Sequence, residues 1–166
     1  MALLGSMNHV SITVSDLTRA MEFFRPFLGF LGYEIWDEIR DPNGQRLHVT
    51  VNHGNGAVLN IWEAKPEHAA HLFEVYEVGL HHIAFNTDTR AQVEGAHKLV
   101  KALGGQILDG PAEFPYDPEG WYAVYFTGPD GLKFEVVYQP STVRRYGELM
   151  RMAESAMKHQ ESGGGV

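Results

Sequence analysis

Residues 8–16 of the chain read NHVSITVSD, and residues 81–88 read HHIAFNTD. Polar and apolar residues alternate in both stretches, and each stretch runs into a similar segment, LTRA at residue 17 and TRA at residue 89. Alternation with a period of two predicts a strand with one buried face. The chain therefore contains a repeat whose unit begins with a strand that leads into a helix.

The two units also end alike. GAVLN at residues 56–60 aligns with GLKFE at residues 131–135, and each segment begins within an NG or DG dipeptide typical of a tight turn. Each unit is thus expected to form one strand, one helix and three further strands. The predicted strands are 8–14, 33–39, 46–53 and 57–63 in the first unit and 80–87, 106–109, 121–127 and 132–138 in the second, and the predicted helices are 17–28 and 90–103.

The repeat predicts a single domain at residues 7–140. Its first module covers residues 7–76 and its second residues 79–140, with a helical linker at 65–76 that has Pro66 in its first turn. The flanking segments are predicted as a disordered leader at 1–6, an amphipathic C-terminal helix at 141–159 and a disordered, glycine-ended tail at 160–166.

Composition narrows the classes of partner. The formal net charge is -8 at pH 7, which argues against nucleic acid or an anionic membrane because both need a basic surface. The chain has no cysteine, which excludes disulfides and thiolate chemistry and is compatible with a cytoplasmic location. Apolar runs are too short for a membrane span. The expected partner is a small molecule.

Alternation assigns the polar side chains to faces of the predicted strands. His9 lies opposite the apolar face of the first strand, His82 occupies the equivalent place in the second module, and His81 falls on the packing side. Glu135 and Asn60 lie on the non-core faces of the last strands of their modules. Two imidazoles and one carboxylate suit Fe(II), Mn(II), Ni(II) or Zn(II). We therefore expect one divalent metal, bound by His9, His82 and Glu135.

The segments NHVSITVSDLTRAMEFF, GLHHIAFNTDT and YFTGPDGLKFEVV resemble the vicinal oxygen chelate superfamily. This superfamily includes glyoxalase I, extradiol dioxygenases, fosfomycin-resistance enzymes, methylmalonyl-CoA epimerase and bleomycin-binding proteins. The resemblance implies an α+β fold in which two tandem βαβββ modules form a half-barrel cavity around a metal, which the substrate chelates through adjacent oxygens. It places the family's ligands on His9, His82 and Glu135, whereas a glutamate of bacterial glyoxalase I falls on Asn60.

The resemblance also suggests catalytic residues. Tyr125 falls where extradiol and fosfomycin enzymes often keep a substrate-contacting tyrosine, although it could be an ordinary strand aromatic. His68 or His71 of the linker could supply an acid or base, or could simply be exposed. Asn60 could donate a hydrogen bond or coordinate the metal weakly. Because an amide stands here where bacterial glyoxalase I has a carboxylate that can act as base, this position weakens the case for a glyoxalase-type proton transfer.

The predicted substrate pocket contains aromatic and polar side chains. Its expected members are Trp62, Trp121, Ser11 and Arg144, the last lying where fosfomycin enzymes contact the phosphonate. Residues 114–122 are rich in Pro, Gly and aromatics and are predicted to form a specificity lid over the pocket. This segment is acidic, and the basic glycine-rich loop of the fosfomycin enzymes is absent from it.

These observations leave three function classes open. The first is a metal-dependent enzyme that catalyses ring-opening dioxygenation or lyase or isomerase chemistry on an oxygen-chelating small molecule. The second is a metal-free binding protein of the bleomycin-resistance type, and the third is a fosfomycin-type resistance transferase. The linker and the C-terminal helix are expected to support a homodimer.

Overall fold

The repeat predicted from the sequence is present in the computed structural model, which describes residues 6–162 and the side chains as far as residue 155. Module one contains β1 (Val10–Val14), α1 (Leu17–Phe30), β2 (Tyr33–Ile35), β3 (Ile39–Arg40), β4 (Arg46–Asn52) and β5 (Val58–Glu63). Module two contains β6 (Ile83–Thr87), α2 (Arg90–Ala102), β7 (Gln106–Glu113), β8 (Tyr122–Thr127) and β9 (Lys133–Tyr138), and α3 (Pro140–Ser162) follows. The predicted α+β class with two βαβββ modules and a C-terminal helix is confirmed.

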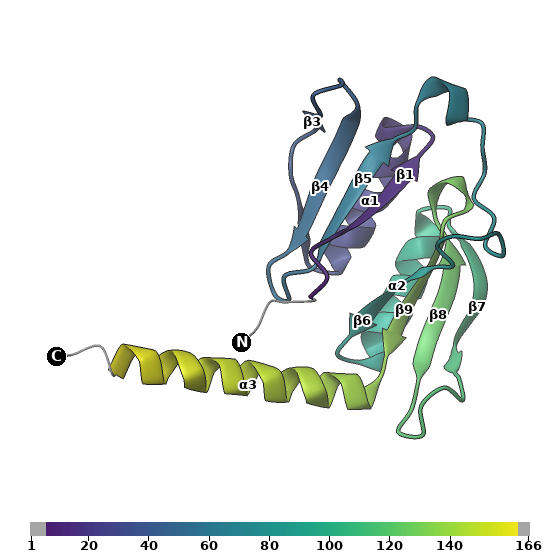
Figure 1. The fold of residues 1–166 in the computed structure, drawn as a ribbon. Helices are drawn as coiled ribbons and strands as arrows, with labels where there is room; N and C mark the ends of the chain where they lie inside the picture. The colour runs from purple at the N-terminus through teal and green to yellow at the C-terminus, as the bar shows by residue number, and fades with distance from the viewer. Residues whose placement is uncertain (1–5, 163–166) are drawn as a thin grey trace.

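The ends of the chain differ partly from expectation. Residues 1–5 of the predicted leader and residues 163–166 of the predicted tail lie outside the described residues. The helix α3 begins at Pro140 and ends at Ser162, so it extends three residues beyond the predicted helix end at 159 and into the predicted tail. It runs away from the two modules as a single projecting rod (Figure 1). Within residues 6–162, no helix has the length and hydropathy required to span a membrane.

The two modules share their strand order and the register between their first and last strands. The strand orders are β1-β5-β4-β2, with β3 beside β4, and β6-β9-β8-β7. In module one Ser11 of β1 pairs with Asn60 of β5, and in module two Ala84 of β6 pairs with Glu135 of β9. The position of Asn60 in its sheet is therefore that of Glu135 in the other, and His9 precedes β1 as His82 precedes β6.

Both helices begin where their sequences provide a cap. The Asp16 side chain accepts a hydrogen bond from the backbone N–H of Arg19 at 3.0 Å, which satisfies one free donor of α1. Thr89 and Gln92 form a reciprocal capping box at the start of α2. These local signals fix the turn between the first strand and the helix in each module.

One aromatic core joins the two modules. The α1 ring of Phe27 lies 5.7 Å from Phe85 of β6 and 5.3 Å from Phe126 of β8, and Phe24 lies 5.8 Å from Phe134 of β9. These rings are almost completely buried, so α1 packs on its own sheet and on that of module two. Figure 1 shows α1 and α2 behind the two sheets, so that neither helix covers the opposite face of either sheet.

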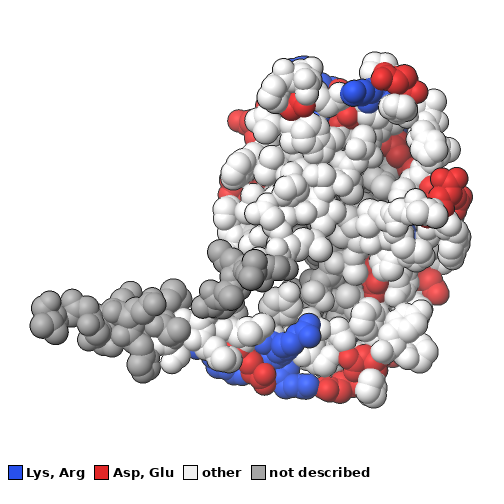
Figure 2. All heavy atoms as spheres, viewed as in Figure 1, with Lys and Arg blue, Asp and Glu red and all other residues white. Residues whose placement is uncertain are grey.

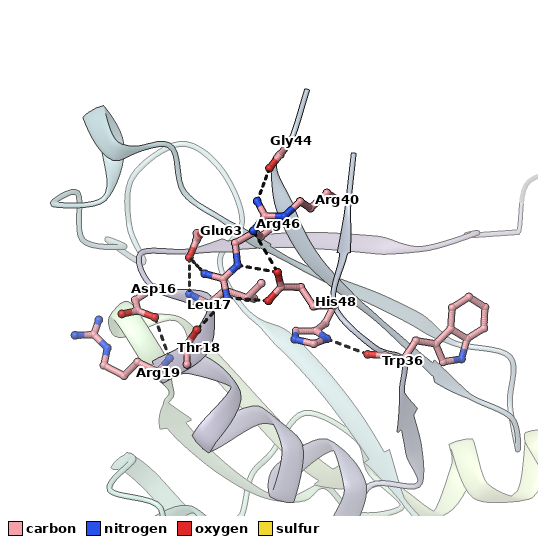
Figure 3. Close-up of polar contacts among 11 residues, drawn as sticks. Asp16, Leu17, Thr18, Arg19, Trp36, Arg40, Gly44, Arg46, His48 and Glu63 are labelled. Atoms are coloured by element: carbon pink, nitrogen blue, oxygen red, sulfur yellow. Dashed lines mark hydrogen bonds and ion pairs between the residues drawn. The ribbon is translucent and has the colours of Figure 1, made fainter. Parts of the chain in front are cut away.

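An arginine network stabilises module one (Figure 3). Arg46 of β4 donates to Glu63 of β5 at 2.6 Å, to Glu38 at 2.8 Å and to Thr18 of α1 at 3.0 Å. The hydrogen bond from Arg46 lowers the pKa of the Glu38 carboxyl, so this pair stays ionised at neutral pH. The network therefore ties two strands to the first turn of α1.

The GPDG turn of module two is bonded to module one. Asp130, whose φ is 58°, accepts hydrogen bonds from the Ser15 backbone N–H and hydroxyl, both at 2.6 Å. Its carboxylate also pairs with Arg19 at 3.2 Å and is only 10% exposed. Ser15 follows the last residue of β1 and Asp130 precedes β9, so the contact brings the C-terminal end of β1 to the N-terminal end of β9.

The predicted linker helix at 65–76 is wrong. The structure has one 3₁₀ turn, η1 (Pro66–His68), followed by further turns. The backbone N–H of Phe73 donates to the carbonyl of Asp130 at 3.2 Å, and its ring packs against the core. This contact with the other module replaces the intrahelical bond that a continuous helix would require.

We expect the Asp130 contact to contribute measurably to stability. Asp130→Gly keeps the positive φ accessible but removes the acceptors for Ser15, and it should lower the free energy of unfolding by about 1–3 kcal/mol. Urea denaturation of the chelator-treated protein would measure this difference. Arg19→Ala removes only the partner that is 65% exposed and should stay within about 0.5 kcal/mol of the parent. Equal losses in the two variants would contradict this account.

Candidate metal and substrate site

A buried carboxylate lies at the centre of the candidate site. Glu135 lies on β9, on the sheet face that bears no helix, and is nevertheless only 2% exposed because His82, Trp121 and Tyr125 surround its carboxylate. Its Oε1 accepts hydrogen bonds from the Trp121 indole N–H at 2.8 Å and the Tyr125 hydroxyl at 2.9 Å. Its Oε2 lies 3.1 Å from Nε2 of His82. A carboxylate this deeply buried needs such partners to offset its lost hydration.

The paired histidines do not follow the predicted alternation. Strand β6 begins at Ile83, so His81 and His82 precede the ladder and no sheet bond fixes their faces. The prediction that His81 lies on the packing side is wrong, since His81 is exposed and lines the same pocket as His82. The Nδ1 atoms of the two rings lie 2.6 Å apart, so one ring donates to the other. His81 is thus a hydrogen-bonded neighbour of His82.

These side chains surround a cavity of about 500 Å³. Its walls combine aromatic rings with titratable groups, as is common in small-molecule sites. The lining residues all belong to module two: His81, His82, Ala84, Leu108, Asp109, Phe114, Tyr116, Trp121, Tyr125, Lys133 and Glu135. Because module one contributes none of them, the cavity is built on one module alone.

The cavity contains two groups with shifted proton affinities. Burial, followed by the hydrogen bond to Glu135, raises the pKa of Tyr125 well above its ordinary value. Tyr125 is therefore protonated at neutral pH and serves as a hydrogen-bond donor. Lost hydration and the positive charge of Lys133 lower the pKa of His81, which favours its neutral form.

Lys133 is a cavity residue that the sequence analysis did not assign. Its ammonium lies 5.4 Å from the centre of the Tyr125 ring, a cation–π contact. The signal was present in the sequence, because Lys133 lies two residues before Glu135 and so on the same face of the strand. His81 was missed as a cavity residue because alternation assigned it to the packing side, whereas Phe114 and Tyr116 belong to the segment 114–122 that was predicted as a lid, and they line the cavity.

The predicted ligand His9 does not join His82 and Glu135 within the chain. It is exposed, and its Nδ1 lies 2.7 Å from the Asn8 side-chain oxygen. Among the described residues no group of three His, Cys, Asp or Glu side chains is placed to hold a metal.

Asn60, Ser11 and Trp62 lie together on the uncovered face of the module-one sheet. Asn60 pairs in register with Ser11, and its amide donates to the Ser11 hydroxyl at 3.4 Å. Its Oδ1 is buried without a hydrogen-bond partner among the described residues. Trp62 lies two residues further along the same face of β5. These residues form a second polar group, related to the Glu135 group by the repeat.

Two predicted site residues lie elsewhere. Arg144 of α3 was expected in the substrate pocket but pairs bidentately with Glu119, at 2.5 and 2.9 Å, beside a separate polar cleft. The prediction for Arg144 is therefore wrong, because a nearby carboxylate captures its guanidinium. His68 is exposed in η1 and does not line the cavity, and His71 is likewise exposed.

The pair formed by His82 and Glu135 has geometry suited to a divalent metal. Two ligand bonds of about 2.1 Å at a right angle separate an imidazole nitrogen and a carboxylate oxygen by about 3 Å, and here the separation is 3.1 Å. Trp121 and Tyr125 both bond the other oxygen of Glu135, which is the type of support that orients a ligating carboxylate. The two residues thus fit as part of a metal site that needs further ligands.

The family of the chain follows from its fold and sequence. Residues 6–136 match the model of the glyoxalase/bleomycin resistance protein/dioxygenase superfamily, and the chain belongs to this family. The protein YqjT of Bacillus subtilis, which has no characterised function, is 28% identical over 134 residues, covering 79% of this chain and 97% of its own.

Two further relatives carry functional descriptions. A 2-epi-5-epi-valiolone epimerase from Actinomyces sp. is 28% identical over 152 residues, covering 82% of this chain and 80% of the epimerase. A fosfomycin resistance protein from Listeria monocytogenes, solved with Mn(II) and a dihydroxypropylphosphonic acid, has a TM-score of 0.61 at 19% identity. This likeness covers 85% of this chain and 97% of that one and concerns the fold alone.

We expect the Tyr125 hydroxyl to stabilise the buried carboxylate. Tyr125→Phe leaves Glu135 with one donor fewer on Oε1 and should lower the free energy of unfolding of chelator-treated protein by about 1–3 kcal/mol. Thermal or urea denaturation would measure it. Tyr116→Phe is the matched control, since Tyr116 is 65% exposed and should change little. An unchanged stability of Tyr125→Phe would contradict the role given to this bond.

Proposed function

We propose that the protein is a divalent-metal-dependent isomerase that moves a proton on a small molecule bearing adjacent carbonyl and hydroxyl oxygens. The observation that carries this proposal is the buried Glu135 carboxylate beside His82, at the base of a cavity lined by aromatic and acid–base groups. The epimerase relative, similar over most of both chains, supports an isomerase rather than another reaction of the family. Fe, Mn, Ni and Zn all suit the proposed ligands.

We also propose that two copies of the chain complete each site. One copy supplies His82 and Glu135, and the partner supplies His9 and Asn60, which the repeat places equivalently on its own open sheet. That His9 does not join His82 and Glu135 within one chain supports this division. In a two-fold symmetric dimer the contact occurs twice, so each dimer contains two complete sites.

The surface of the chain supports such pairing. The face that includes the uncovered side of the sheets is largely free of charge, and the charged residues visible in this view lie mostly around its margin (Figure 2). On module one this face includes Ser11, Val49 and Trp62. The helix α3 adds an exposed apolar side, since Tyr146, Leu149 and Met150 are each about half exposed. Because each copy has a net charge of -8, two copies that met through charged faces would repel each other, and an uncharged contact face avoids this.

Each side chain of the site has its own role in the proposed reaction. A bound divalent metal would act as a Lewis acid toward the chelating substrate oxygens. Tyr125 remains protonated, and its one O–H, which bonds Glu135 in the structure, would turn to a substrate oxygen during the reaction, while His81, facing the cavity, accepts or returns the proton. Asn60 of the partner copy has no carboxylate and contributes only hydrogen bonding. Lys133 adds a positive charge that favours an electron-rich substrate.

Ring-opening dioxygenation is the second candidate function. Two histidines and one carboxylate suit Fe(II), and Tyr125 lies directly beside the carboxylate. This candidate requires oxygen as co-substrate, which separates it experimentally from proton transfer. The bleomycin-resistance type of binding protein requires no metal, and the fosfomycin-type function is disfavoured because Arg144 lies outside the cavity.

The shared site makes a specific prediction for mixed dimers. His9→Ala and Glu135→Ala should each lower metal affinity at least about 100-fold, because each site loses one ligand. Dimers that combine one copy of each variant regain one intact site, so co-expression should restore roughly a quarter of the metal. Elemental analysis after purification without chelator measures this, with His68→Ala as the histidine control. Normal metal content in His9→Ala would refute the shared site.

The reaction class is tested by hydrogen exchange into substrate. Metal-loaded protein in D₂O should replace the hydrogen next to the carbonyl of polyhydroxylated α-hydroxyketones, as seen by ¹H NMR, without consuming oxygen. Tyr125→Phe should slow this exchange by about 10²-fold or more, since a positioned proton donor is lost. Oxygen uptake with catechols would instead support the dioxygenase. Ligand binding with neither reaction would support the metal-free binding protein.

A further inference from the structure

A further cluster of polar side chains, separate from the two polar groups on the sheets, lies where the segment 114–121 meets the start of α3. Asp117 accepts hydrogen bonds from the Gln139 amide at 2.6 Å and from the Ser141 hydroxyl at 2.8 Å. Two residues further on, Glu119 forms the bidentate pair with Arg144. The carboxylates of Asp117 and Glu119 therefore hold the segment to the end of β9 and the start of α3. Their partners there are Gln139, Ser141 and Arg144.

Asp117 also organises its own turn. Its Oδ1 accepts from the backbone N–H of Glu119 at 2.7 Å, and its carbonyl accepts from Gly120 at 3.0 Å. A Cβ atom added at Gly120, whose φ is +119°, would make ordinary van der Waals contact with Pro140 of α3 at 3.8 Å, so the turn lies next to the start of the helix. The hydrogen bonds from Gln139, Glu119 and Ser141 lower the pKa of Asp117, which keeps this acceptor ionised at neutral pH.

The same segment supplies one wall of the cavity. Phe114 and Tyr116 stack with centroids 5.8 Å apart, and Tyr116 meets Trp121 edge-on at 5.7 Å. Phe114 also packs edge-on against Tyr125, at 5.2 Å, and its backbone N–H bonds the Trp121 carbonyl at 2.8 Å. Trp121 then donates to Glu135. The aromatic wall is thus continuous with the buried carboxylate on one side and with the Asp117 turn on the other.

We propose that Asp117 and the Glu119–Arg144 pair form a latch that fixes the aromatic wall of the cavity. Asp117 is then a positioning residue that acts through Tyr116 and Trp121, and the first turns of α3 set the shape presented to the substrate. A substrate role for the wall rests on the proposed function, whereas the latch itself does not. The exposed part of Tyr116, at 65%, leaves the wall free to swing outward when the latch is broken.

The latch is tested first without substrate. Asp117→Ala and Arg144→Glu should each raise amide hydrogen exchange in residues 114–121 at least about tenfold, since these bonds hold the segment closed. The Trp121 indole resonance should shift, while those of Trp36 and Trp62 stay in place. The charge-swapped double variant Glu119→Arg with Arg144→Glu should restore both signals, and Arg151→Ala, an exposed arginine further along α3, is the control. Unchanged exchange in both single variants overturns the latch.

A second measurement separates positioning from stability. With any substrate turned over by the parent, the broken latch should raise KM about tenfold with little change in kcat, because the reacting groups of the cavity remain in place. Metal content should equal that of the parent. A fall in kcat with unchanged KM would refute the positioning role. If no substrate is turned over, the proposed function fails, and the exchange and indole results still decide the latch.

Discussion

The structure depends on the packing of α1 against both sheets. Its phenylalanine rings meet Phe85, Phe126 and Phe134 of module two, so one helix closes the core of both modules. Aromatic rings buried at this density resist rearrangement, since any shift leaves voids that water does not fill. Both sheets therefore turn one face to the helices and leave the other uncovered. The polar residues of the candidate site lie on those uncovered faces.

The repeat then gives each open face an equivalent set of positions. Module two fills them with His82, Glu135 and Tyr125, whereas module one has His9, Asn60 and Val49. Replacement of a carboxylate by an amide makes the two sets chemically unequal, although their backbones are alike. A site that combines one set of each kind has a single carboxylate ligand and an amide opposite it. At these positions module two supplies His82 and Glu135 and module one supplies His9 and Asn60, so neither module alone supplies two histidines and a carboxylate.

The wall and the base of the cavity are held in place by different interactions. Strand pairing fixes Glu135 and Tyr125, which face one another in register on β9 and β8. Residues 114–121 have no ladder over most of their length and depend on side-chain contacts with α3 instead. Charge-assisted hydrogen bonds to Asp117 and Glu119 are strong enough to order such a segment and weak enough to release it. The base is thus rigid and the wall is adjustable.

The sequence by itself determined the repeat, the class of fold and the strand positions of Asn60 and Glu135. These rest on alternation, capping and turn residues, which act between near neighbours and survive without tertiary context. Boundaries were less well determined: β6 starts three residues later than expected and so frees His81 from the packing face.

Only the tertiary structure decided which of these groups meet. In the packed modules His9 does not join His82 and Glu135, the backbone N–H of Phe73 bonds the Asp130 carbonyl in place of a linker helix, and Glu119 pairs with Arg144. Each of these outcomes depends on residues that are far apart in the chain, or on groups that compete for one partner. Local periodicity records which face a side chain occupies, but which faces come together depends on long-range packing, which has no local signature.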